Sequence, residues 1–514
     1  MKYIQVFGLV LFVAGLLLFS LLPFIGQNTL TEEVLLENAR EDHAATLLDV
    51  FSKVMDKTYG SHIRFISDIN GLLDAHNENL KEQELWDEVI WDDYAFILTK
   101  ASGHGPVQDK TGLFLVLALI VPIAGALAYI FPMYRNEPEG IKNDRIYFSA
   151  MKARGWLGIV TGTYLILFYI ILYWFPEYIA NSIKIFDPVS LFLSGNEASQ
   201  WFMYGALYTL AILVMGVRIF RKYRGNTHQI IRTVSVMFFQ LSFAFLIPEM
   251  LVRFNKPWYD FKNIWPLDYS FFFEYRISEM LSSGTLGLFI LFWGILLIIL
   301  SVPILAYFYG KRWYCSWVCG CGGLAETLGD PYRHLSDKRL KAWQIERYMV
   351  HGVFVFAIVM TAVTIWNYFS GFALLGEATD MLHQWYGFLI GSAFAGVIGV
   401  GFYPFMGSRV WCRFGCPLAA YLGIVQRFKS RFRITTNGGQ CISCGNCSTY
   451  CEMGIDVKWY AQRGQNIVRA SCVGCGVCSA VCPRGVLRLE NKETKGRINT
   501  HPIIIGNDSI EVKN

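Results

Sequence analysis

The chain has 514 residues, of which 54% are hydrophobic and only 17% are charged, and its net charge is +5. A soluble enzyme or a disordered chain of this length would carry more charge, and a nucleic-acid binder would gather its basic residues on one soluble domain. None of the 13 cysteines precedes Cys315, which excludes a disulfide-stapled secreted scaffold. Composition therefore predicts a membrane protein.

Eight apolar stretches are long enough to cross a hydrocarbon core of about 30 Å as helices. The first is expected to be a retained N-terminal anchor, because only one lysine precedes it and no small-residue cleavage site stands out near Gly26. The predicted spans are Tyr3–Ile25, Thr111–Met133, Gly155–Phe175, Trp201–Phe220, Thr233–Val252, Thr285–Gly310, Met349–Phe369 and Trp385–Met406.

Basic side chains cluster in alternate loops and predict the orientation of the chain. The loop after the third span has only Lys184, residues 372–384 have no basic residue, and residues 253–284 have four against four acidic ones. Both termini are therefore predicted to be cytoplasmic, and the protein to lie in the inner membrane. The basic loops contain Arg135, Lys142, Arg145, Lys152 and Arg154, then Arg218, Arg221, Lys222, Arg224 and Arg232, then Lys311, Arg312, Arg333, Lys338, Arg339, Lys341 and Arg347.

The first loop, residues 27–110, is predicted to lie outside and to be helical. It holds 17 acidic and 7 basic residues, which makes it the most acidic part of the chain. Apolar residues recur there at helical spacing, as Ala44, Leu47, Leu48 and Phe51 show.

Three polar residues inside the predicted spans are candidates for contact with a quinone head group or for structural roles. Gln240 and His351 can hydrogen-bond a quinone, and Glu249 can pair with Arg253 at i, i+4 spacing or lie at the interface. Ordinary hydrogen bonding between helices or interfacial anchoring is the interpretation that we favour for each.

A cysteine motif follows the sixth and the eighth spans. Gly310, Arg312, Cys315 and Cys319 match Gly407, Arg409, Cys412 and Cys416 with a single offset of 97 residues, which indicates an internal repeat of a span pair and its cap. On a continuous helical turn, each C-x3-C pair would place its cysteines on one face at the cytoplasmic membrane surface.

The sequence leaves the role of these thiols open. Buried filler cysteines are a poor explanation for four matched positions in aromatic, arginine-containing surroundings. Cys315, Cys319, Cys412 and Cys416 can ligate a third cluster or another thiophilic metal, with Cys321 as a spare or substitute ligand. Alternatively, they can form dithiol/disulfide pairs that exchange electrons with other centres. These five are the candidate redox thiols.

Two cysteine runs follow the last span, each with the C-x2-C-x2-C-x3-C spacing of bacterial ferredoxins. In such runs three cysteines bind one iron–sulfur cube and the fourth binds the other. Cluster one is therefore assigned to Cys441, Cys444, Cys447 and Cys482, and cluster two to Cys472, Cys475, Cys478 and Cys451.

Zinc is the alternative metal for these runs, but zinc sites pair two C-x2-C knuckles and do not use four cysteines in eleven residues. One departure from the ferredoxin pattern is Glu452, which stands where proline usually follows the fourth cysteine. A carboxylate there can shift the potential of cluster two without affecting ligation.

The capped C-x3-C motifs together with the paired ferredoxin runs resemble the NosR/NapH/CcoG group of membrane polyferredoxins over roughly residues 285–489. The resemblance implies electron transfer between quinol or a cytoplasmic donor and an extracytoplasmic respiratory reductase or its maturation, with nitrous oxide reductase as the best single guess. Other implied partners are membrane lipid and a partner redox subunit. A cupric reductase that serves copper oxidase assembly, and a redox sensor, are the alternative functions.

The predicted fold class is mostly α: a polytopic bundle of about eight membrane helices with a C-terminal cytoplasmic α+β ferredoxin domain that holds two 4Fe–4S clusters. An enzymatic activity beyond electron transfer is left open. The predicted parts are the anchor (1–26), the acidic outer segment (27–110), spans two to five with their loops (111–284), the repeated capped span pairs (285–430), the ferredoxin domain (431–490) and a tail (491–514).

Overall fold

The computed structural model describes residues 2–138, 140, 142, 146, 149–371, 378–491, 503–505 and 510–512. Three parts of the sequence predictions lie outside these residues, namely Arg145, the start of the 372–384 loop and most of the 491–514 tail. Within the described residues, eight helices are long and apolar enough to cross a membrane. This result confirms the predicted helical, multi-pass fold class.

The eight candidate spans agree in order with the predicted stretches and differ at their ends. The seventh begins at Leu340 rather than Met349, and the eighth ends at Gly401 because the short helix α23 (Tyr403–Met406), with Pro404 in its first turn, starts there. The spans are Lys2–Phe24 (α1, η1), Thr111–Ile130 (α7, η3, α8), Trp156–Trp174 (α9), Gln200–Lys222 (α12), Thr227–Arg253 (α13, η5, α14), Gly284–Tyr309 (α16, η6, α17), Leu340–Ser370 (α20) and Ala378–Gly401 (α21, η8, α22).

Four of these spans contain a π-helical segment. The segments are η3 (Val116–Ile120), η5 (Phe239–Leu246), η6 (Leu297–Ser301) and η8 (Gly387–Ile398). A π-helical turn widens the helix and is common next to functional sites.

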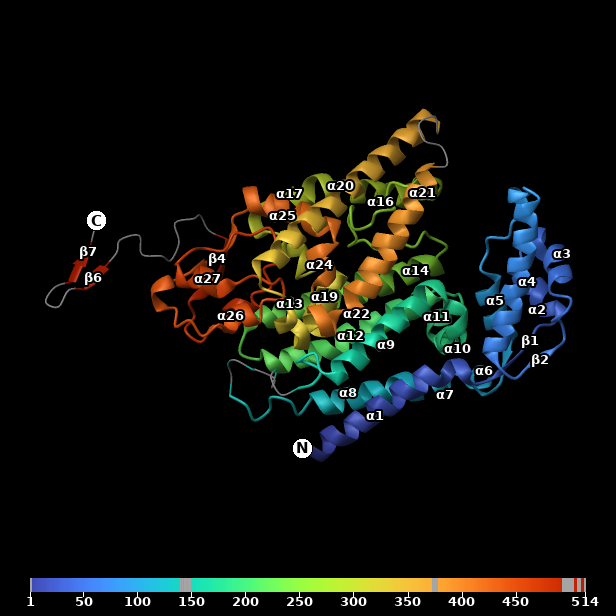
Figure 1. The fold of residues 1–514 in the computed structure, drawn as a ribbon, viewed down its shortest axis with the longest axis horizontal. Coiled ribbons are helices and arrows are strands. Elements are labelled where there is room, and N and C mark those ends of the chain that lie inside the picture. The colour runs from blue at the N-terminus through green and yellow to red at the C-terminus, as the bar shows by residue number, and fades with distance from the viewer. Residues whose placement is uncertain are drawn as a thin grey trace. The chain divides into compact units, whose positions relative to one another are not determined.

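The chain divides into two compact units. Unit 1 comprises Met1–Met133, Leu167–Leu207 and Val252–Phe254, and unit 2 comprises the remainder. In unit 1, α1 (Lys2–Leu21) and α8 (Val121–Ile130) lie side by side (Figure 1). Their glycines allow this close approach, because a Cβ atom on Gly8 would lie 2.5 Å from the Gly125 carbonyl oxygen.

The acidic segment of unit 1 folds into helices around a small sheet. The sheet has the strand order β2-β1-β3, with antiparallel pairing. Leu47, Phe51, Phe65 and Leu98 lie in its buried core. Its elements are β1 (Gln27–Thr29), α2 (Glu32–Asn38), α3 (Glu41–Val50), β2 (Thr58–Tyr59), α4 (His62–Glu82), α5 (Tyr94–Ser102), β3 (Gly103–His104) and α6 (Pro106–Asp109). Unit 1 also contains α10 (Ala180–Lys184) and α11 (Asp187–Leu193).

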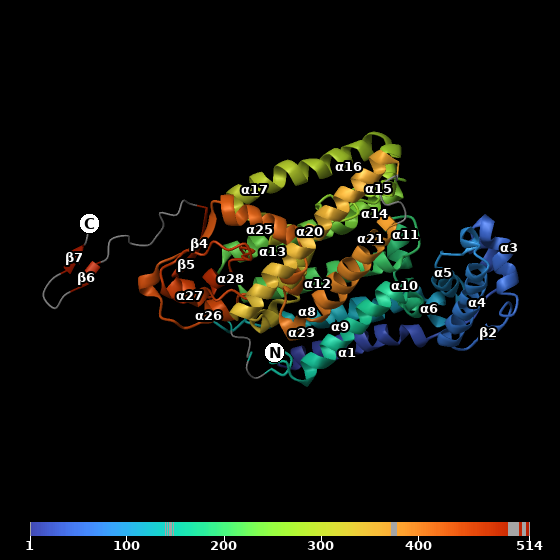
Figure 2. The same cartoon turned by 45° about the horizontal axis from the view of Figure 1, so that its top comes forward.

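The ferredoxin domain lies in unit 2 and is built on one antiparallel strand pair (Figure 2). In this pair Phe432 lies opposite Asn491, and Thr436 lies opposite Leu487. One buried core joins this domain to the cysteine motifs of the repeat. The elements are β4 (Phe432–Thr436), α26 (Asn446–Thr449), α27 (Val457–Gln462), α28 (Val477–Ala480) and β5 (Leu487–Asn491), and β6 (Ile503–Ile505) and β7 (Ile510–Val512) pair further on.

A leucine at Gly125 should weaken the α1–α8 pair. The added side chain would collide with backbone and Cβ atoms of α1 at 2.6 to 2.9 Å, and overpacking of this kind costs about 1–3 kcal/mol. We expect a lower midpoint of thermal unfolding for the detergent-solubilised protein. Gly112→Leu is the matched control, because no atom lies within 4 Å of a Cβ there, and an equal loss in both variants would contradict the prediction.

Candidate iron–sulfur and thiol sites

The four cysteines assigned to cluster one line a single cavity in the ferredoxin domain. Cys441, Cys444, Cys447 and Cys482 surround it, together with Ile442, Lys458 and Arg484. Cys444 is exposed and Cys447 is buried, so this cavity reaches the domain surface. Gly445 has a φ of +82°, which lets the loop between Cys444 and Cys447 turn tightly around the space that the four sulfurs enclose.

The cysteines assigned to cluster two form a second, more buried group. Cys472 and Cys478 are buried, and Cys451 and Cys475 are close enough to Cys478 for their charges to raise the pKa of its thiol, which burial raises most. Gly476 has a φ of +78°, and a Cβ atom there would lie 3.0 Å from the His228 ring. The loop therefore fits tightly between the thiols and the start of α13 (Thr227–Phe238).

Both groups fit 4Fe–4S clusters by the chemistry of their donors. Each consists of four thiols, which is the ligand set that such a cluster uses. Burial raises the pKa of Cys447 to about 12 and that of Cys472 to about 11, so the free thiols keep their protons at neutral pH. Binding of a cluster would release these protons, and the bonds to iron would offset the free-energy cost of burying the charged thiolates.

The five candidate redox thiols of the repeat also meet in one cavity. Its non-cysteine lining is mostly apolar and includes Leu267, Tyr314, Trp411 and Leu418. The cysteines are Cys315, Cys319, Cys321, Cys412 and Cys416, and all five are free thiols.

The predicted continuous helical turn for each C-x3-C motif is wrong. Cys315 ends α18 (Arg312–Cys315), while Cys319 has extended backbone and caps the N-terminus of α19 (Gly320–Thr327). In the second motif Cys412 lies in α24 (Val410–Phe414), and Cys416 caps α25 (Pro417–Lys429). Pro417 begins a new helix because its ring fixes φ and needs no N–H partner in the first turn.

One backbone N–H donates to a sulfur of this cavity. The Ala419 N–H donates to Cys416 Sγ over 3.4 Å at the start of α25.

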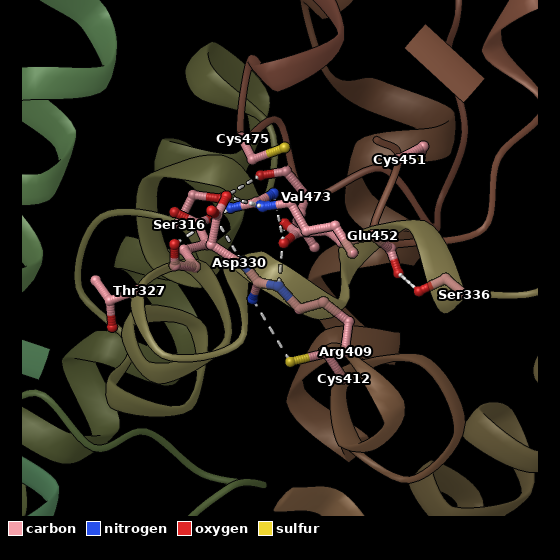
Figure 3. Close-up of polar contacts among 12 residues, drawn as sticks. Ser316, Thr327, Asp330, Ser336, Arg409, Cys412, Cys451, Glu452, Val473 and Cys475 are labelled. Atoms are coloured by element: carbon pink, nitrogen blue, oxygen red, sulfur yellow. Dashed lines mark hydrogen bonds and ion pairs between the residues drawn. The ribbon is translucent and has the colours of Figure 1, made fainter. Parts of the chain in front are cut away.

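Arg409 contacts both the repeat cysteines and the ferredoxin domain (Figure 3). Its Nε lies 3.1 Å from Glu452 Oε1, and its Nη2 lies 2.5 Å from Glu326 Oε1. Its Nη1 donates to the Cys315 carbonyl over 3.1 Å and lies 3.6 Å from Cys412 Sγ. One buried guanidinium thus bridges the two cysteine regions.

Two further arginines complete this buried network. Arg333 Nη1 lies 2.7 Å from Glu452 Oε2, and Arg232 pairs with Glu326. Oxygen atoms of both carboxylates and the Cys475 sulfur lie within 4.8 Å of one another, a spacing that can suit a metal ion. The three arginine charges around the carboxylates make a cation at this point electrostatically unfavourable.

Burial and the arginine charges act in opposite directions on the two carboxyl groups of the network. Burial tends to raise the pKa of Glu452, but the charges of Arg333 and Arg409 outweigh it, and the net pKa is lowered. At Glu326 burial dominates, and the pKa is raised despite Arg232 and Arg409. The network therefore favours the charged form of Glu452, which follows the predicted cluster-two ligand Cys451.

The quinone candidates have partners within the protein. Gln240 donates to Thr209 Oγ1 over 3.2 Å, and the His351 ring bonds to the Arg347 carbonyl. Glu249 accepts a hydrogen bond from Trp258 at 3.3 Å. The sequence predictions did not include Glu326 and counted Arg232 and Arg333 only as orientation signals. The motif position of Arg409 and the unusual Glu452 were the available signals.

Comparison with known protein families agrees with this geometry. A family described as "4Fe-4S binding domain" matches residues 291–341 and 388–435, which hold the two repeat motifs. A "4Fe-4S dicluster domain" family matches residues 440–487. The chain carries 4Fe–4S ferredoxin domains.

Several curated proteins are similar to parts of the chain. "Putative electron transport protein YccM" of Escherichia coli is 30% identical over 169 residues, which are 29% of this chain and 43% of that protein. "Methylamine utilization ferredoxin-type protein MauN" is 25% identical in Methylobacillus flagellatus and 28% identical in Paracoccus denitrificans, over 28% of this chain and 50% and 48% of those proteins. The chain spans about half the length of these relatives. No solved structure matches.

Replacing Glu452 by Gln should raise the reduction potential of cluster two. The change removes the negative charge that neutralises Arg333 and Arg409. The positive charges that remain stabilise the reduced cluster, because it is more negative than the oxidised one. We expect about a tenfold shift of the reduction equilibrium, which is about 59 mV for one electron. A potential titration monitored by EPR measures it.

Glu490→Gln is the matched control for this experiment, because it removes a carboxylate from the same domain whose hydrogen-bond partner is Thr435. The potential of cluster one should stay constant in both variants. An equal shift of cluster two in both variants, or a lower potential in Glu452→Gln, would contradict a specific effect of the network.

Proposed function

We propose that the protein is a membrane-bound iron–sulfur electron-transfer protein. The observation that carries this proposal is the convergence of two four-cysteine groups in one domain that shares a buried core with the membrane bundle. Two clusters so close to each other serve to pass single electrons. Cluster one would be held by Cys441, Cys444, Cys447 and Cys482, and cluster two by Cys451, Cys472, Cys475 and Cys478.

The exposure of the two groups suggests the order of electron transfer. Cluster one would face solvent through the exposed Cys444, whereas none of the four cluster-two cysteines is exposed and two of them, Cys472 and Cys478, are buried. A cytoplasmic donor can therefore reach cluster one directly, and cluster two would receive the electron next. The excess of basic loops on one side supports a cytoplasmic ferredoxin domain in the inner membrane.

The recipient that we propose is an extracytoplasmic reductase, a factor in its maturation or a partner redox subunit. Nitrous oxide reductase is the choice that the family resemblance implies, and it stays a prediction. Quinol is the alternative donor, and a bound quinone would be the corresponding cofactor. The names of the similar proteins, an electron transport protein and a ferredoxin-type protein, support the general role.

A cupric reductase is the second candidate function, because thiolates prefer Cu(I). The repeat cavity offers five free thiols for such an ion. Within the part of the chain that the structure describes, however, the group of three ligand atoms within 4.8 Å contains a single cysteine, Cys475. Among these described residues, no three of the repeat sulfurs lie within 4.8 Å of one another, which suits a cluster better than one copper ion. A redox sensor is a third role with the same cofactors.

Anaerobic purification followed by iron analysis tests the proposed function. We expect at least eight irons per chain, because each cube holds four, and EPR signals from two interacting clusters after reduction. Cys444→Ser should remove about four irons by opening cluster one, whereas Ser443→Ala, next to it, should retain all of them. Zinc in place of iron in oxygen-free wild-type protein would refute the proposal.

A further inference from the structure

The depth of the repeat cavity can be measured along one membrane helix. At its start, Gln229 donates to the Cys475 carbonyl of the cluster-two loop over 2.8 Å. Eleven residues further, Gln240 packs against Gly320, where an added Cβ atom would lie 2.6 Å from Gln240 Oε1. At 1.5 Å per residue, this step corresponds to about 16 Å. Because the span ends at Arg253, Gly320 lies near the middle of it.

The second cap enters the bundle to a similar level. Gly415 packs against Phe394, which lies inside the span that ends at Gly401. From there α25 returns toward the surface: the Tyr421 hydroxyl donates to the Ile298 carbonyl inside the sixth span, and Ser430 donates to the Tyr307 carbonyl near the end of that span. Both caps therefore fold back between the spans.

The loop between the fifth and sixth spans approaches the same cavity from the opposite end of the bundle. It has irregular backbone over residues 254–273, and Leu267 lines the cavity. The Tyr314 hydroxyl donates to the Lys262 carbonyl over 2.9 Å, and Trp265 Nε1 donates to Thr361 Oγ1 over 2.9 Å. Irregular backbone at membrane depth is tolerated where protein buries it or where it lines a site.

The surroundings of the cavity favour an anionic occupant. The N-termini of α19 and α25, capped by Cys319 and Cys416, both begin at the cavity. Helix N-termini carry partial positive charge and stabilise anions. Arg409 adds a full positive charge beside Cys412, and the Lys262 ammonium lies 3.6 Å from the Cβ position of Gly320. Four thiolates around an iron–sulfur cluster supply such an anionic group.

We propose that the repeat cysteines hold a third iron–sulfur cluster near the middle of the membrane, and that electrons cross the membrane through it. The proposal rests on the electron-transfer function above. One electron would leave reduced cluster two and reduce the third centre, and a redox partner on the side of the 254–273 loop would then take it. No bond is made and no proton is required. Cys412, Cys416, Cys315 and one of Cys319 and Cys321 are the ligands.

A disulfide relay is the competing explanation for these thiols. It would transfer two electrons with two protons and would need no iron. A third cluster instead predicts about 12 irons in the wild-type protein, at four per cube. Cys412→Ser should then lose about four irons and keep the EPR signals of the two ferredoxin clusters, which also shows that the variant folds. Cys444→Ser should lose a different four irons and keep the third signal.

The iron count separates the failure of this inference from that of the proposed function. About eight irons in the wild type, unchanged in Cys412→Ser, would overturn the third cluster and leave the two-cluster function intact. Absence of iron from all variants would refute both. If Cys412→Ser loses all its iron, Cys416→Ser is measured in its place. An EPR signal of the third cluster that stays intact in Cys416→Ser would also overturn the assignment.

Electron transfer across vesicles tests the position of the site. The full chain is reconstituted into quinone-free phosphatidylcholine vesicles with trapped ferricyanide and an ionophore, and dithionite is added outside. Each electron taken from dithionite should reduce one ferricyanide inside to ferrocyanide, at least tenfold faster than in protein-free vesicles. Cys412→Ser should fall to the protein-free rate. A wild-type rate equal to that of the variant would refute a path through the repeat cysteines.

Discussion

Charge compensation within an apolar bundle is the constraint on which the redox region depends. A buried guanidinium without a partner costs several kcal/mol, so each arginine here requires a carboxylate, a carbonyl or an anionic ligand. Arg409 satisfies this requirement through Glu326, Glu452 and the Cys315 carbonyl at the same time. The same contacts fix the distance between the ferredoxin domain and the repeat cavity. The contacts that neutralise Arg409 thus also set the spacing of the two cysteine regions.

The network of buried ion pairs extends to the fourth span, and its side chains together carry a net positive charge. Asp330 pairs with Arg218, Lys222 and Arg333, which lowers the pKa of this buried carboxyl despite its desolvation. The network as a whole contains more arginine and lysine than carboxylate. Anionic iron–sulfur clusters on either side of it would supply the missing negative charge, and this explains why so many buried cations are tolerated in this part of the bundle.

Local patterns in the sequence predicted part of this arrangement. The cysteine spacing after Pro417 identified both ferredoxin groups, and hydropathy located all eight spans, because ligand spacing and helix length are local properties. The depth of the caps is not local. Gly320 and Pro417 start new helices that turn inward. The 254–273 loop also turns inward, and within it the Lys262 ammonium pairs with Asp260 at 2.9 Å. In the sequence, the equal numbers of basic and acidic residues in that loop are typical of an ordinary surface loop.

The widened helical turns have a consequence for how this fold tolerates change. Gln240, Ile298 and Phe394 all lie in π-helical segments at the level of the cavity, and the free Ile298 carbonyl accepts the Tyr421 hydroxyl there. Each such segment accommodates one more residue per turn than an α-helix. Deleting a single residue there would remove the widened turn, whereas deleting one from an α-helical part would rotate everything beyond it by about 100°. Chain length within these spans is therefore as constrained as residue identity.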